Sequence, residues 1–130
     1  MSKKCPCGSQ QLFSECCQPI HKNIYLAQTP LQLMKSRYSA YVMGNIDYLK
    51  ISHQRRTRKK VDFQDIRSWT NSVVWMQLEI IATEMKNDNE GFVTFKAFFR
   101  EHGKLEVIYE KSRFLRQDGH WVYVDGQFLN

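Results

Sequence analysis

The sequence predicts an α+β fold, in which helices come first and an antiparallel sheet follows, preceded by a small cysteine-rich knuckle. Helix signals precede residue 73, strand-like alternation follows it, and all four cysteines lie before residue 18. With 130 residues and 42% hydrophobic content, the chain suits one soluble domain with a core of its own. We therefore divide the chain into a knuckle at 1–24 and an α+β domain at 25–130.

Three helices are predicted from their start and stop signals. They cover residues 30–43, 46–52 and 62–72. Thr29 offers a hydroxyl N-cap, and Pro30 suits the first helical position because a proline there loses no hydrogen bond. Gly44 supplies a stop for the same helix, and Asp62 can cap the third helix. Between the second and third helices we expect a basic loop.

Four strands are predicted in the second half of the chain from alternation and turn residues. They cover residues 73–86, 92–101, 105–116 and 120–125. In the second of them, alternate residues from Val93 to Phe99 are apolar and share one face, which we expect to turn toward the core. Asp118-Gly119 is a strong hairpin signal because both residues tolerate the positive φ of a tight turn. The sheet should therefore be an antiparallel meander.

The four cysteines follow the spacing C-x-C-x8-C-C, which favours a zinc site. They are Cys5, Cys7, Cys16 and Cys17. Zinc takes four sulfur or imidazole ligands in a tetrahedron, and this spacing lets one tight loop bring both pairs together. Four protein ligands leave no open coordination position, so we expect one structural zinc ion. Two alternatives stay open, namely redox pairing of the cysteines and His21 in place of Cys17 as the fourth ligand.

The hydropathy and charge of the sequence indicate where the protein is located in the cell and what it could bind. No apolar run is long enough to span a membrane and no signal-peptide pattern precedes the cysteines, so we expect a cytoplasmic protein without membrane contact. A reducing compartment favours metal binding over disulfides. The net charge is +6, and five Lys or Arg residues fall within segment 53–60. Such a run is typical of a solvated loop, and contact of Arg55–Lys60 with nucleic acid or an acidic partner is the alternative.

Several motifs resemble known families. Cys5-Pro-Cys-Gly-Ser, followed by Cys16-Cys17, resembles the zinc motif at the C-terminus of the SecA translocation ATPase. Residues 33–42 resemble the hallmark helix of the YchJ-type family of uncharacterised bacterial proteins. Matches to later family motifs follow at 91–93, 112–116 and 118–126. Ser52-His53 stands where family members commonly carry Trp-His. The resemblance implies a cone-shaped domain similar to nuclear transport factor 2, with helices packed on a curved antiparallel sheet, and no established reaction.

Domains similar to nuclear transport factor 2 often enclose a pocket between helices and sheet. The candidate pocket residues are Arg37, Tyr38, Tyr41, His53, Trp69, Ser112, Arg113 and Asp125. In an enzyme, His53 could act as the base, with Tyr38 or Tyr41 as the donor to a developing oxyanion. We favour structural roles instead, with Trp69 in the core and His53 solvated at the head of the basic loop. For the two arginines we expect buried ion pairs, with Asp47 or Asp125 as the acids.

Two functions of different classes are compatible with the sequence. The first, which we favour, is an interaction module in which the zinc knuckle or its basic surroundings contact a protein partner. The secretion or translation machinery would be the partner by analogy with the SecA-type motif. The second is a small-molecule binder or enzyme that uses the conical pocket. A pocket filled by Phe and Trp side chains favours the first function, whereas a buried polar cluster of His53, a Tyr and an acid favours the second.

Overall fold

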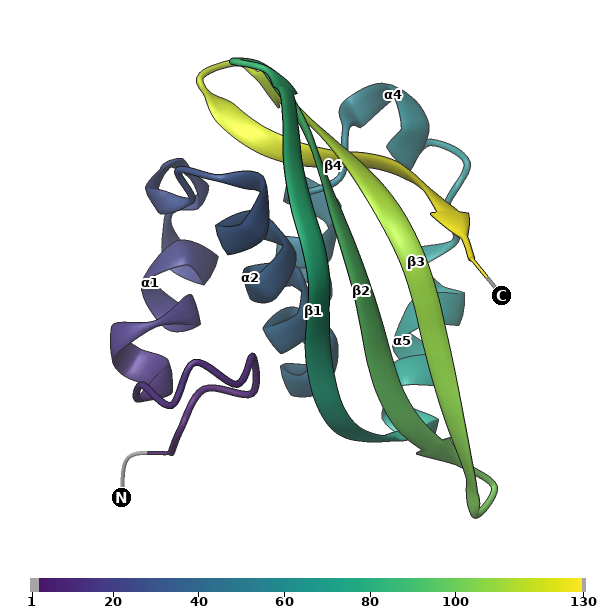
Figure 1. Ribbon diagram of the computed structural model, residues 1–130. Helices are drawn as coiled ribbons and strands as arrows, with labels where there is room; N and C mark the ends of the chain where they lie inside the picture. The colour runs from purple at the N-terminus through teal and green to yellow at the C-terminus, as the bar shows by residue number, and fades with distance from the viewer. Residues whose placement is uncertain (1–2, 130) are drawn as a thin grey trace.

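The computed structural model describes residues 3–129 and shows helices packed on one face of a four-stranded sheet (Figure 1). The helical elements are the 3₁₀ turns η1 (Phe13–Glu15) and η2 (Ile24–Leu26) and the helices α1 (Cys17–Lys22), α2 (Pro30–Met43), α3 (Ile46–Ile51), α4 (Arg55–Arg58) and α5 (Phe63–Ser72). The strands are β1 (Val74–Asn87), β2 (Glu90–Glu101), β3 (Lys104–Gln117) and β4 (His120–Phe128), and they are ordered β1-β2-β3-β4. The predicted α+β architecture is confirmed.

The boundaries of α2 follow from local signals. Thr29 Oγ1 accepts a hydrogen bond from the Gln32 amide at 3.1 Å, and Pro30 occupies the first turn. Gly44 ends the helix with a φ of 72°, a left-handed conformation that glycine adopts without strain. The predicted helix 30–43 is therefore confirmed, and α3 and α5 lie within a residue of their predicted ranges.

The sheet is an antiparallel meander joined by tight turns. Asp118 and Gly119 have φ values of 55° and 83°, so the predicted hairpin turn is confirmed. His102 and Gly103 form the preceding turn with φ values of 52° and 78°. Strands β2 and β3 pair without interruption, whereas the pairing of β1 with β2 has three register shifts. Such bulges bend a strand, and Figure 1 shows β1 curving with the sheet around the helices.

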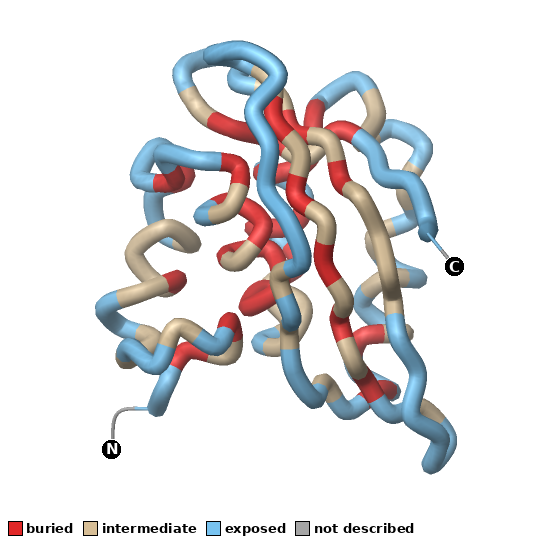
Figure 2. Tube along the Cα trace, viewed as in Figure 1, coloured by how far each residue is buried: buried red, intermediate tan, exposed pale blue. Residues whose placement is uncertain are grey.

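The main core lies between α2 and the inner face of β2. Alternate residues from Val93 to Phe99 are buried, as predicted, and their outward neighbours are half-buried (Figure 2). Leu33 and Tyr38 of α2 belong to the same cluster, and so does Ile24 of η2. A separate small cluster consists of buried cysteines and Phe13. The division of the chain at residue 24 stays a prediction. Within residues 3–129, no helix combines the length and apolar character that a membrane crossing requires.

Removal of the α5 N-cap should destabilise the domain. Asp62 Oδ1 accepts hydrogen bonds from the amides of Gln64 at 3.0 Å and Asp65 at 3.2 Å, so it satisfies two amides of the first helical turn. We expect Asp62→Ala to lower the free energy of unfolding by about 1 kcal/mol. Asp62→Asn keeps the acceptor and should stay close to wild type. Urea unfolding of both variants measures the difference, and equal losses in the two would contradict this capping role.

Candidate metal centre and pocket

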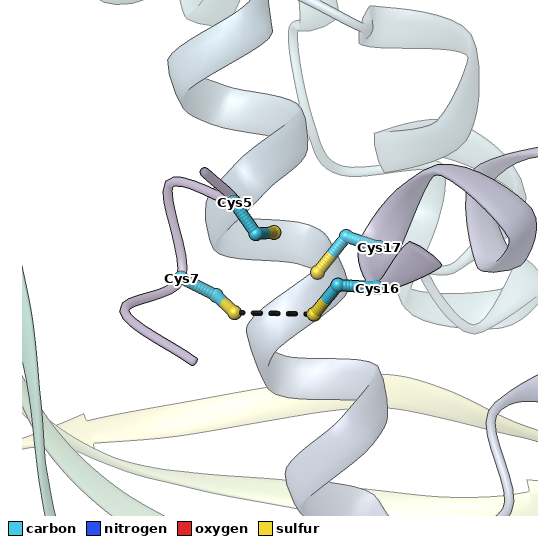
Figure 3. Close-up of side chains that lie close together, drawn as sticks. All are labelled: Cys5, Cys7, Cys16 and Cys17. Atoms are coloured by element: carbon cyan, nitrogen blue, oxygen red, sulfur yellow. Dashed lines mark hydrogen bonds between the residues drawn. The ribbon is translucent and has the colours of Figure 1, made fainter. Parts of the chain in front are cut away.

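The N-terminal segment folds back on itself, so that its four cysteines meet. An antiparallel bridge between Lys4 and Leu12 closes the turn. This brings the first two cysteines, Cys5 and Cys7, opposite the second two, which stand at the start of α1. The four Sγ atoms lie within 4.8 Å of one another and point toward a common centre (Figure 3). All four cysteines are free of disulfides. The group can therefore hold a metal ion.

The donor geometry fits a tetrahedral ion with four thiolate ligands. Zinc–sulfur bonds of about 2.3 Å place the sulfurs of a tetrahedron about 3.8 Å apart. Cys7 Sγ lies 3.6 Å from Cys16 Sγ. A hydrogen bond from Cys17 lowers the pKa of the Cys7 thiol to about 4, whereas burial raises the pKa of Cys16. A divalent ion would stabilise all four cysteines as thiolates.

The knuckle contacts α2 through two buried serines. Cys5 Sγ lies 3.5 Å from Ser39 Oγ. His21 Nε2 donates a hydrogen bond to the Ser36 carbonyl at 2.7 Å, and burial lowers the pKa of this imidazole. His21 is therefore engaged by α2, and the structure places Cys17 with the other three sulfurs.

A buried hydrogen-bonded path continues from Ser36 toward the sheet. Ser36 Oγ donates to a carbonyl of its own helix and accepts from the Tyr48 hydroxyl at 2.5 Å. Ser52 Oγ donates to the Tyr48 carbonyl at 2.6 Å and accepts from Arg37 Nη1 at 2.7 Å. Tyr48 of α3 and the C-cap residue Ser52 thus connect the knuckle side of α2 with Arg37.

A cavity of about 290 Å³ lies between the helices and the inner face of the sheet. Six of the sequence-predicted candidates line it, namely Arg37, Tyr38, Tyr41, His53, Trp69 and Ser112. Arg113 and Asp125 do not. They pair with each other at 3.1 Å, with 33% and 59% of their side-chain surfaces exposed. The expected ion pair of these two residues forms, but it is exposed and not buried.

Aromatic side chains form one wall of the cavity. The half-buried Trp69 meets Trp75 and Tyr41 edge-on, at ring-centroid distances of 5.4 and 6.5 Å. Tyr41 also contacts Trp75 at 5.8 Å. Burial raises the pKa of Tyr38 to about 12, so this phenol stays protonated at neutral pH. The expected core position of Trp69 was therefore wrong, because this side chain is half-buried and forms part of the cavity wall.

The opposite side of the cavity carries a carboxylate that the sequence reasoning missed. Glu110 Oε2 accepts hydrogen bonds from Ser112 Oγ at 2.5 Å and from the Tyr123 hydroxyl at 3.3 Å. Burial and then the negative charge of Glu110 raise the pKa of Tyr123, which keeps it protonated. The sequence did contain a signal for Glu110, namely the alternation of inward-facing and outward-facing residues along β3. Glu110 stands between the inward-facing Ile108 and Ser112, where an acid is out of place in a plain core.

His53 is buried, with 7% of its surface exposed, so the expected solvated position was wrong. A bridge to Tyr123 ties its segment to β4, and its ring meets the rings of Tyr123 and Phe63 at 5.0 and 6.2 Å. Burial, and then the charges of Arg37 and Arg58, lower the pKa of His53 to about 4. The imidazole is therefore neutral at physiological pH.

Arg37 is buried without the expected acid. Nη1 donates to the Leu49 carbonyl at 3.0 Å and to Ser52 Oγ at 2.7 Å, and the guanidinium carbon lies 4.7 Å from the centre of the Tyr123 ring. Within residues 3–129, no carboxylate approaches its nitrogens to 4.0 Å, so the predicted pairing with Asp47 was wrong. Neutral acceptors and an aromatic face hold this cation in place.

The basic segment borders a second, more open hollow of about 610 Å³. The predicted loop was wrong in part, because Arg55–Arg58 form the single turn α4. The hollow is lined by basic residues of this segment and by His120 of β4. The residues from the segment are Arg55, Arg56, Arg58 and Lys59. One acid, Asp118, lies among them. Arg58 is held by two hydrogen bonds to the His53 carbonyl, at 3.2 and 2.9 Å. The hollow is therefore strongly cationic.

Comparison with known proteins identifies the family. Residues 29–126 match the family described as "YchJ, middle NTF2-like domain", and residues 1–19 match the SEC-C motif. The UPF0225 protein of Vibrio cholerae serotype O1 is 41% identical over 125 residues, which covers 95% of this chain and 82% of that protein. The chain belongs to the YchJ-like UPF0225 family. A UPF0225 protein of Photorhabdus laumondii is 44% identical over 129 residues, covering 97% of this chain and 81% of the relative.

A solved structure carries the same fold as this UPF0225 chain. The solution structure of RPA3114, a SEC-C motif containing protein from Rhodopseudomonas palustris, superposes with a TM-score of 0.88 at 29% identity. The match covers 97% of this chain and 98% of that one. The SEC-C start and the domain resembling nuclear transport factor 2, both expected from the sequence motifs, are therefore confirmed.

The buried imidazole of His53 should make stability depend on pH. Its pKa of about 4 lies below the ordinary 6.5, so the unfolded chain binds more protons between these values and stability falls as the pH drops through this window. The loss should approach about 3 kcal/mol, and His53→Gln should remove most of it. A smaller decline should remain, because the pKa of His21 is lowered as well.

Urea unfolding between pH 7 and pH 4 measures the effect. The matched control is His102→Asn, an exposed turn histidine at φ 52°, a value that asparagine tolerates. An unchanged decline in His53→Gln would contradict the neutral, buried state of this side chain.

Proposed function

We propose that this UPF0225 chain binds a small organic molecule in its cavity, and that its cysteine knuckle holds one structural zinc ion. One observation supports the binding function most. A mainly aromatic and aliphatic cavity also contains Arg37, His53, Glu110 and Tyr123. Burying charged and polar groups costs several kcal/mol, and apolar residues would fill a purely structural core more favourably. Polar groups retained in this position are therefore best explained by a ligand.

These groups are suited to hydrogen bonding and proton transfer. Glu110 Oε2 is occupied by two hydroxyl donors, whereas Oε1 has no partner among residues 3–129. Oε1 can accept a hydrogen bond or a proton from a ligand, and Tyr123 is kept protonated as a donor. His53 is neutral and lies against Tyr123. The set corresponds to the polar cluster of His53, a Tyr and an acid that favours a ligand-binding pocket over an interaction module, with His53 buried and Glu110 and Tyr123 half-buried.

Zinc is the ion that suits the knuckle best. Four thiolates in a tetrahedral arrangement are the donor set of structural zinc sites, and they leave no position open for a substrate. The small buried cluster at the knuckle consists of cysteines, with Phe13 packed against it. Such a segment has little apolar surface to bury, so metal binding would supply much of its folding free energy.

Metal analysis should find about one zinc ion per chain in protein purified under reducing conditions. A Cys16→Ser/Cys17→Ser variant should lose the ion, whereas Ser14→Ala, in the same loop, should keep it. Chelation should raise hydrogen exchange in residues 3–22 and leave α2 and the sheet protected. Protein without zinc whose cysteines form a disulfide would contradict the metal site. Cooperative unfolding of the whole chain would contradict the division at residue 24.

A protein-interaction module is the second candidate, and the cationic hollow is the observation that favours it. Arg55, Arg56 and Lys59 are exposed, and one acid faces this part of the surface. An acidic segment of a partner would be steered there by charge. The secretion or translation machinery is proposed as the source of that partner only by analogy with the SEC-C motif.

The three tryptophans allow the two functions to be separated by NMR. Trp69 and Trp75 line the cavity, whereas the Trp121 indole donates to the Gln28 carbonyl at 3.2 Å outside it. A screen of small organic molecules should yield ligands that shift the indole N–H signals of Trp69 and Trp75 and leave that of Trp121 in place. Binding should survive charge reversal at the exposed Arg55 and Arg56 and weaken in Glu110→Gln.

The opposite pattern would contradict the binding function. In that pattern no small molecule shifts the Trp69 and Trp75 signals. Acidic peptides instead shift the amide signals of residues 55–59, and they bind less tightly when the charges of Arg55 and Arg56 are reversed. Such a result would support the interaction module.

A further inference from the structure

The Arg37 guanidinium has one edge engaged and one edge free. Nη1 is fixed by the Leu49 carbonyl and Ser52 Oγ. Nε and Nη2 have no hydrogen-bond partner among residues 3–129. Both atoms are accessible to solvent, because the fully buried side-chain polar atom without a partner in this part of the chain is Gln54 Oε1. Arg37 is only 7% exposed and lines the cavity. The free edge therefore meets the space inside the cavity.

The positive charge at this end of the cavity is poorly balanced. Glu110 directs Oε2 to Ser112 and Tyr123 and comes no closer than 4.0 Å to any Arg37 nitrogen. A second cation, Arg58, is anchored to the carbonyl of His53 on the same side. A buried cation whose donors lack partners is costly, and a bound anion removes that cost.

We propose that the cavity binds a small monocarboxylate with an aromatic or apolar body, and that the carboxylate pairs with the Nε–Nη2 edge of Arg37. This inference rests on the proposed binding function and names its ligand class. Two parallel N–H donors on one planar edge match the two oxygens of a carboxylate. The negative charge of Glu110 in the same cavity disfavours a dianion such as phosphate.

The rest of the cavity suits the body of such a ligand. The aromatic wall of Tyr41, Trp69 and Trp75 offers ring faces and edges against which a flat or apolar group packs. The volume of about 290 Å³ lies at the lower end of the range for ligand pockets, so the body is no larger than a single ring with a short chain. Glu110 Oε1 is left to accept a hydrogen bond from a ligand donor.

The test compares two probes of the same shape, phenylacetate and phenylacetamide. Dissociation constants are measured at pH 7.5 from the indole N–H shifts of Trp69 and Trp75, with Trp121 as the internal reference for folding. We expect phenylacetate to bind at least about tenfold more tightly than the amide, since a charge-assisted hydrogen bond is stronger than a neutral one. Arg37→Gln should abolish this preference, and Arg37→Lys should keep part of it. Arg113→Gln, which removes an exposed cation outside the cavity, should leave it unchanged.

The outcomes separate this inference from the binding function. If both probes bind with equal affinity in the wild type, the cavity is a binding site but the carboxylate clamp is wrong. A preference that persists in a folded Arg37→Gln protein also overturns the clamp. If neither probe binds while other library molecules shift Trp69 and Trp75, the ligand class is wrong and the binding function stands. If no molecule of any class shifts these signals, both proposals fail.

Discussion

Helix α2 is buried on all sides over more than one turn, and the cysteine cluster and the cavity both depend on how its polar side chains find hydrogen-bond partners there. Every residue from Ser36 to Ala40 is buried. Ser36 and Ser39 are three apart and share the side toward the knuckle, whereas Arg37 and Tyr41 are four apart and share the side toward the cavity. A buried helix with polar groups on two sides is stable only if each group finds a partner. The knuckle and α3 supply partners for the serines, whereas one edge of Arg37 has no partner within residues 3–129.

The knuckle and the cavity are consequently parts of one network. His21 holds the Ser36 carbonyl, Tyr48 holds the Ser36 hydroxyl, and Ser52 links the Tyr48 carbonyl to Arg37. Each hydrogen bond in this path is buried or nearly so and is therefore stronger than the same bond in water. A metal ion that fixes the four sulfurs would also fix α1 against α2. An ion held by the four cysteines would in this way contribute to the placement of Arg37 at the cavity.

The features that the sequence predicted correctly are those decided by neighbouring residues. The cap of α2 at Thr29, its glycine stop and the Asp118-Gly119 turn each act within a few positions of the chain. The cysteine cluster was predictable because the ligand spacing closes a single loop. The environment of His53 was not predictable from its neighbours in the sequence. His53 is buried because β4, seventy residues later in the chain, lies beside it and forms a bridge at Tyr123. Glu110 was missed for a related reason, because its inward direction has meaning only once the sheet closes over the helices.

The carboxylate of Glu110 also explains a glycine that no turn requires. Gly126 lies inside β4 and has no positive φ, so its backbone could accept any residue. A Cβ at this position would overlap the Glu110 carboxylate, which lies directly against the strand. Glycine in a strand interior weakens the strand, so its presence here calls for a local reason. The reason is space, because the missing side chain lets Glu110 lie beside Ser112 and Tyr123 at the cavity. A glycine just beyond the predicted strand 120–125 thus makes room for the polar side of the pocket.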